Sequence, residues 1–143
     1  MATVLYVADA IVAALNSATL SLPVSAQRLY VPNFDLQDTK NLQVTVVPRE
    51  VQITALDRRR DVHEVSVDVA IQKKFDKGDA PEIDPLVVLV EEITDLFKHT
   101  RLDSFPAAMW SKTQHLVLYS AEHWEQLRQF TSLLTLTFRV ARG

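Results

Sequence analysis

The side chains able to do acid–base or metal chemistry are scattered along this sequence. The four histidines are His63, His99, His115 and His123. Their spacing matches no metal-binding or catalytic motif. His63 is followed by Glu64, but a metalloprotease helix needs its second histidine at position 67, which is Val67 here. We therefore interpret the histidines as structural or solvent-exposed.

The acidic residues also lack the arrangement of a catalytic pair. Glu91 and Glu92 are adjacent in a predicted helix, where successive side chains point about 100° apart. They do not converge on one atom, so we interpret them as a hydrated helix face. Serine, histidine and aspartate are all present, yet no spacing marks a nucleophile. We expect that the protein is not an enzyme.

The composition removes further classes of site. The 143 residues include two glycines and no cysteine. Glycine-rich phosphate loops and the nucleophile elbow each need several glycines at fixed spacing, so both are excluded. The lack of cysteine excludes disulfides, thiolate zinc sites and thiol nucleophiles. We expect no cofactor and no metal.

Length and hydropathy predict one globular domain over residues 1–143. A chain with 48% hydrophobic and 23% charged residues is ordinary for a folded domain, and its net charge is −3. No stretch approaches the ~20 consecutive apolar residues of a membrane span. The first apolar segment has no basic lead-in of the kind that opens a signal peptide. We expect no membrane association.

Two basic clusters are the candidate interface or lumen residues. They are Arg58, Arg59 and Arg60, and the pair Lys73 and Lys74. Aspartates flank both clusters and neutralise much of their charge: Asp57, Asp61, Asp76 and Asp79. Two interpretations stay open, an ordinary charged loop and a surface that meets a protein partner or passing DNA.

Aromatic residues and an apolar first helix offer other contact surfaces. Helical spacing predicts a helix over residues 4–16, capped by Thr3 and almost without polar side chains. So little polar surface suggests burial on more than one side, against a sheet or a neighbouring subunit, and makes this helix an interface candidate. Tryptophans and tyrosines anchor protein contacts when exposed, but we expect at least half of the five to lie in the core: Tyr6, Tyr30, Trp110, Tyr119 and Trp124.

The remaining pattern alternates strands with one further long helix. Strands are predicted at residues 25–31, 42–47, 51–56, 65–75, 115–119 and 130–140, with a turn region at 33–41 and Pro48 ending the second strand. A polar loop at 76–83 precedes an amphipathic helix that starts at Asp84 and Pro85 and ends near Lys98. Residues 101–112 look irregular, and Ser120 caps a short helical turn.

This order predicts an α+β fold. A mainly antiparallel β-sheet packs against the long amphipathic α-helix and the N-terminal apolar helix. The strands at 65–75 and 130–140 are long enough to be central neighbours.

Four stretches taken in order resemble a known family. They are LQDTKNLQVTVVPR (36–49), VSVDVAIQKK (65–74), EIDPLVVLVEEITDLF (82–97) and FTSLLTLTFRV (130–140). The chain resembles the tail terminator, or tail completion, proteins of long-tailed bacteriophages with non-contractile tails. The resemblance implies a structural virion protein that forms a hexameric ring, caps the tail tube, stops its polymerisation and provides the head–tail joining surface. It transfers no catalytic residue.

The resemblance also implies partners and a location. The partners are further copies of the chain, the tail tube protein and the head-completion or connector proteins, and genomic DNA passes through the lumen without sequence-specific binding. The location is the virion tail at the head–tail junction, after assembly in the host cytoplasm. We expect the five basic residues at a subunit boundary or at the lumen, the strand at 65–75 to pair edge to edge with a partner, and the loop at 76–84 to order on contact.

Two other functions remain open from the sequence. One is another phage head–tail joining or neck adaptor protein. The second, from a different class, is a small cytoplasmic enzyme or ligand-binding α+β domain.

Overall fold

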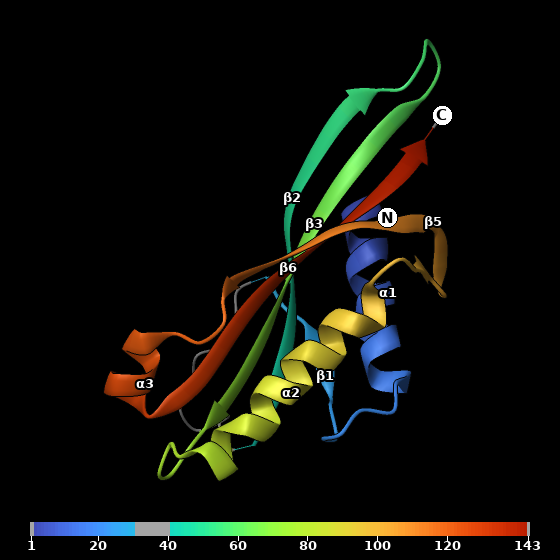
Figure 1. Cartoon of the computed structure of the whole chain (residues 1–143). Helices are drawn as coiled ribbons and strands as arrows, with labels where there is room; N and C mark the ends of the chain where they lie inside the picture. Colours follow the sequence, from blue (N-terminus) through green and yellow to red (C-terminus); the bar gives the residue numbers. More distant parts are fainter. Residues whose placement is uncertain (1, 31–40, 143) are drawn as a thin grey trace.

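The structure is a computed structural model that describes residues 2–30 and 41–142 (Figure 1). Its elements follow in this order: α1 (Thr3–Ser17), β1 (Ala26–Arg28), β2 (Gln43–Ala55), β3 (Asp61–Lys74), α2 (Ala80–Phe97), β4 (Arg101–Leu102), β5 (Phe105–Val117), α3 (Ala121–Leu127) and β6 (Gln129–Arg142). The turn predicted at 33–41 lies outside the described residues except for Asn41.

The described strands form one strongly twisted mixed sheet in the order β1-β2-β3-β6-β5-β4 (Figure 1). β1 runs parallel to β2, and the other neighbouring pairs are antiparallel. β3 and β6 pair along their whole length, from Asp61 opposite Arg142 to Lys74 opposite Gln129. The predictions of an α+β fold and of two long central strands are confirmed.

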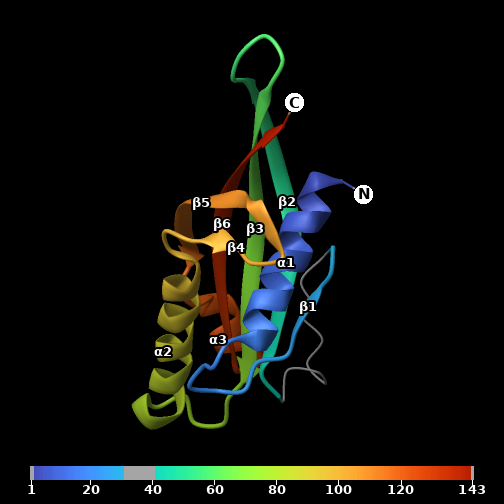
Figure 2. The ribbon, with the colours of Figure 1, turned by 90° about the vertical axis from the view of Figure 1, so that its right-hand side faces the viewer.

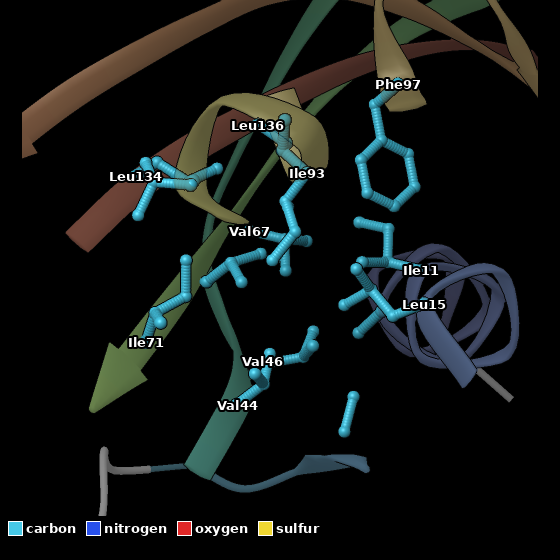
Figure 3. Close-up of a cluster of buried hydrophobic side chains, with 14 of the residues drawn as sticks. Ile11, Leu15, Val44, Val46, Val67, Ile71, Ile93, Phe97, Leu134 and Leu136 are labelled. Carbon is cyan, nitrogen blue, oxygen red and sulfur yellow. The ribbon is translucent and has the colours of Figure 1, made fainter. Parts of the chain in front are cut away.

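The core lies between one face of this sheet and the helices α1 and α2 (Figure 2). Alternate side chains of β3 point to this face because a strand has a period of two, and Val65, Val67, Val69 and Ile71 are fully buried there. Figure 3 shows Ile11 and Leu15 of α1, with Ile93 and Phe97 of α2, directed at the same cluster. Burial of these branched side chains fixes the register of the sheet.

The opposite face of β6 is buried as well, although it is polar. Thr131, Thr135 and Thr137 are each less than 7% exposed. The Thr135 hydroxyl donates to Asp68 Oδ1 at 2.6 Å, and Thr137 bonds the Ser66 hydroxyl at 3.1 Å. Hydrogen bonds between neighbouring strands thus satisfy polar groups that burial would otherwise penalise.

The first helix starts at its predicted cap, one residue earlier than predicted. Thr3 is the first helical residue, Ala2 takes the capping position, and no side chain caps the helix. The Thr3 hydroxyl instead accepts a hydrogen bond from Arg142 Nη1 at 2.8 Å. The long-range contact with the end of β6 thus uses the group that local pattern assigned to capping.

The second helix begins at Ala80, four residues before the predicted start, with Pro85 inside it. The carboxylate of Glu82 accepts the backbone N–H groups of Asp76, Lys77 and Gly78 at 2.7–2.9 Å. Gly78 has a φ of +73°, and an added Cβ there would lie 2.9 Å from the Phe75 ring. The predicted loop at 76–84 is therefore a compact turn held by Glu82, and its last residues belong to the helix.

Pro48 does not end the second strand. β2 continues to Ala55, with a shift in its register against β3 between Pro48 and Glu50. A proline without an N–H is tolerated at such a bulge, so the two short strands predicted at 42–47 and 51–56 are one long strand.

The stretch predicted as irregular, 101–112, contains β4 and most of β5. β5 pairs with β6 from Met109 onward, while Pro106 lies in the part of β5 before that pairing. The prediction was wrong because it used local breakers and took no account of β6, which supplies the hydrogen-bonding partner for this strand.

Candidate assembly surfaces

The three arginines form the tip of the β2–β3 hairpin. Asp57 Oδ1 accepts the backbone N–H groups of Arg59 and Arg60 at 2.8 and 2.9 Å, and Asp57 Oδ2 lies 2.9 Å from Arg60 Nη2. These hydrogen bonds, led by that from the Arg59 backbone, hold the pKa of Asp57 below its ordinary value. Among the described residues, Arg58 and Arg59 have no ion-pair partner. Their guanidinium groups are available to a partner.

The lysine pair lies at the far end of the same strand. β3 runs from Asp61 to Lys74, and 14 extended residues span roughly 45 Å. Lys73 lines a shallow apolar hollow with Leu22, Val24 and Leu42. The structure therefore does not bring the two predicted basic clusters together, and any joint site would need more than one copy of the chain.

The histidines likewise form no cluster, and three of them contact side chains of their own surroundings. His115 Nε2 lies 3.2 Å from the Thr94 hydroxyl, which itself donates to the Val90 carbonyl. His123 Nδ1 lies 2.8 Å from the Thr131 hydroxyl, and the His99 ring stacks edge-on against Trp110. Within residues 2–30 and 41–142, no three histidines or carboxylates gather where they could hold a metal ion.

The adjacent carboxylates on α2 point in different directions. Glu92 accepts hydrogen bonds from the backbone N–H and hydroxyl of Ser21 at 3.1 and 2.5 Å. Glu91 is exposed on the other side of the helix. Exposed residues of α2 at i, i+4, i+7 and i+11 form one stripe: Asp84, Val88, Glu91 and Asp95. Asp95 pairs with Lys98 at 3.0 Å.

The first helix uses most of its apolar surface inside its own chain. Val7, Ala8, Ile11 and Leu15 are at most 1% exposed. This burial against the sheet leaves α1 a weaker interface candidate than predicted.

The aromatic residues divide by type. Both tryptophans are half-buried against the core, whereas Tyr6, Tyr30 and Tyr119 are 45%, 69% and 51% exposed. The prediction that at least half of the five lie in the core was wrong, because each tyrosine ring packs on one neighbour at the surface: Phe105, Arg28 and Trp124, respectively.

β3 cannot pair with a partner, contrary to prediction, because β2 and β6 occupy both of its edges. Two other edges are open in the described part of the chain. β1 covers β2 only along Val44–Val46, and the segment leading into β4 covers β5 only as far as Trp110, whose N–H donates to the Thr100 carbonyl at 2.9 Å. Open strand edges carry unpaired N–H and C=O groups that can pair with another chain.

Exposed apolar side chains follow both open edges. On the β2 side, Val51, Ile53 and Leu56 are 39%, 59% and 48% exposed. On the β5 side, four consecutive residues from 116 to 119 are each at least 39% exposed: Leu116, Val117, Leu118 and Tyr119. Contiguous exposed apolar residues mark interaction sites in folded proteins. The sequence signal for the second set was an apolar run of four at the end of a predicted strand.

Two surface features recur below and are named here. The arm is residues 49–65, the outer part of the β2–β3 hairpin; its β3 strand pairs with β6 as far as Asp61, and its turn projects beyond the end of β6 (Figures 1 and 2). The α2–β5 groove is an open hollow between α2 and the end of β5. Its floor is mainly apolar and its rim is charged, with these lining residues: Val87, Val90, Glu91, Thr94, Asp95, Lys98, His115 and Leu118.

A polar hollow lies on the sheet face opposite the helices. β2, β3, β6 and β5 each contribute side chains, including Arg49, Glu64, Lys112 and Thr137. Arg49 Nη1 lies 3.5 Å from Asp68 Oδ1, and Arg139 Nε lies 3.6 Å from Glu64 Oε1. Charges of both signs alternate on this face, so it has no concentrated positive field.

No protein-family profile and no curated protein sequence matches this chain. Among solved structures, the chain is similar to the sheath/tube terminator of an extracellular contractile injection system, PVC, in its extended state. The alignment covers all of this chain and 58% of that one, with 14% sequence identity and a TM-score of 0.46. The chain thus spans less than two thirds of that protein. No helix of the described residues is long and apolar enough to cross a membrane.

Proposed function

We propose that this chain is a structural protein of a phage virion, without enzymatic activity. It assembles into a hexameric ring that caps the tube of a non-contractile tail, stops tube polymerisation and offers the joining surface to the head-completion proteins. The sequence resemblance over residues 36–49, 65–74, 82–97 and 130–140 supports this assignment.

The pair of open edges is the observation that carries the proposal. Strand direction alternates from β2 through β3 and β6 to β5, so β2 and β5 run in opposite directions. When β2 of one copy lies beside β5 of the next, the sheet continues with antiparallel pairing. Because the two edges differ, the contact is head to tail, and repeated rotation closes such a contact into a ring.

The polar sheet face suits the lumen of this ring. With the helices outside, the face bearing Ser66, Lys112, Gln114 and Thr137 lines the hole. Passing DNA needs a surface that does not bind phosphates tightly, and mixed charges with neutral hydroxyls and amides meet that need. The chain therefore lets DNA pass without reading its sequence.

Tube growth in vitro tests the function. Purified chain is added to the polymerising tube protein of the phage that encodes it, and tube lengths are measured by electron microscopy. We expect growth to stop after addition, whereas Leu116→Lys/Leu118→Lys, which places charge on the open β5 edge, fails to stop it. Tubes that grow unchanged with the wild-type chain overturn the proposal. If tube length is normal without the chain but heads fail to join, the neck adaptor function holds instead.

A further inference from the structure

The arm carries an unusual amount of uncovered surface for part of a folded sheet. Each residue from 49 to 61 is exposed. Val51 lies opposite Val65 and Ile53 opposite His63, so the two apolar side chains share the sheet face that carries the core. Beyond α1, no helix in the described residues covers this face (Figure 2). The arm therefore presents an exposed apolar strip, with two arginines at its tip that are unpaired among the described residues, and this strip can bind another surface.

The α2–β5 groove has the complementary properties. Val87, Val90 and Leu118 give it apolar walls, and Leu118 is 45% exposed. On its charged rim Asp95 and Lys98 pair with each other, whereas Glu91 is exposed and has no ion-pair partner among the described residues. Asp84, on the same helix stripe, is also exposed without an ion pair in the described part of the chain.

The arm and the groove cannot meet within one chain. Both views place the arm at one end of the molecule, with α2 extending toward the other (Figures 1 and 2). The arm therefore needs a second molecule. That molecule must offer an apolar channel edged with carboxylates, which is what the chain itself carries beside the open edge of β5.

We infer that the arm of one copy binds in the α2–β5 groove of the next copy, with Val51 and Ile53 on the apolar walls and Arg58 and Arg59 near Asp84 and Glu91. This inference rests on the proposed ring and names the contact that orders its subunits. The groove adjoins the β5 edge, so strand pairing and arm binding form one continuous interface. Its charge pairs select the correct neighbour, while apolar burial supplies the affinity.

Disulfide trapping tests the contact directly, since the chain has no cysteine of its own. Ile53→Cys/Leu118→Cys is oxidised at rising protein concentration and run on a denaturing gel, beside each single variant. We expect a ladder of covalent oligomers from the double variant alone. Ile53→Cys/Met109→Cys is the matched control, because Met109 is also exposed but lies toward the other end of β5, and it should give no ladder.

Charge reversal provides the second readout. Arg58→Glu/Arg59→Glu and, separately, Asp84→Arg/Glu91→Arg should each weaken self-association by roughly tenfold, and the combined variant should recover it. Glu122→Arg/Glu125→Arg makes the same charge change on α3 and should have no effect. Both sets are read by sedimentation velocity.

These experiments distinguish a failure of the arm contact from a failure of the proposed function. A ring that forms without a 53–118 disulfide, or a chain that stays monomeric at every concentration, overturns the arm contact. If the ladder forms but tubes still grow past the chain, the arm contact stands and the proposed function fails.

Discussion

At the scale of single residues, Glu82 holds a backbone turn together. Its carboxylate gathers three backbone N–H groups from the turn that leads into α2. Those hydrogen bonds, led by that from Asp76, lower the pKa of Glu82 below its ordinary value of 4.5. A group with a depressed folded pKa stabilises the protein above its unfolded pKa, and this contribution is lost as pH falls through the folded pKa.

Glu82→Gln therefore should unfold at a lower temperature than the wild-type chain at pH 7. The difference in melting temperature should narrow as pH falls below 4.5. Protonation then removes the charge of the wild-type carboxylate, which glutamine lacks at every pH. Thermal melts followed by circular dichroism from pH 7 to pH 3 measure this. Glu125→Gln, at an exposed position on α3, is the control and should melt with the wild type at pH 7. A Glu82→Gln melt equal to the wild type at pH 7 contradicts the assigned role.

The basic residues illustrate what a residue-level pattern can predict. Arg58 to Arg60 occupy an exposed turn, which agrees with the charged loop that was one of the two interpretations of the sequence. Their separation from Lys73 and Lys74 follows from the length of β3 alone, so an extended strand in the sequence already carried that signal. Whether either cluster reaches a subunit boundary or the lumen stays a prediction.

At the scale of elements, the sheet divides into a buried centre and exposed edges. Leu136 on β6 is fully buried, whereas Leu118 just after β5 is 45% exposed. Leu136→Ala should lower the free energy of unfolding by about 2–5 kcal/mol, because it removes buried methyl groups and leaves a cavity. Leu118→Ala should change it by about 0.5 kcal/mol or less.

Chemical denaturation of both variants at low protein concentration measures these changes. Similar losses from the two variants would contradict the division into centre and edge. Leu118→Ala should nevertheless weaken self-association, since Leu118 is part of the groove wall.

Helices and strands with a regular hydrophobic period could be predicted from the sequence. Strands that depend on pairing with a strand far along the chain could not. The alternation of Val65, Val67, Val69 and Ile71 located β3, and the apolar stripe of 86–97 located the body of α2. β5 has no such alternation, and its course depends on pairing with β6, more than ten residues further along the chain. The prediction that Pro48 ends a strand was wrong for the same reason, because an irregularity in the pairing of β2 with β3 accommodates the proline.

At the scale of the whole molecule, two unlike surfaces face away from each other. The β2 edge continues into an arginine-tipped arm, and the β5 edge continues into an apolar groove whose charged rim carries Glu91, unpaired among the described residues. The sequence predicted contact surfaces only as local features, the two basic clusters and the apolar first helix. The sequence did not predict where these surfaces lie, because the open edges can be identified only from the strand order of the folded sheet.

The number of copies bound at each tube end tests the central claim most directly. Tubes of the phage proposed to encode the chain are mixed with the purified protein, and the mass of any cap is measured by scanning transmission electron microscopy. The proposed ring predicts six copies of the 16.2 kDa chain at one end of every tube and none along its length. Binding along the tube wall, or tubes whose ends carry no cap, would contradict it.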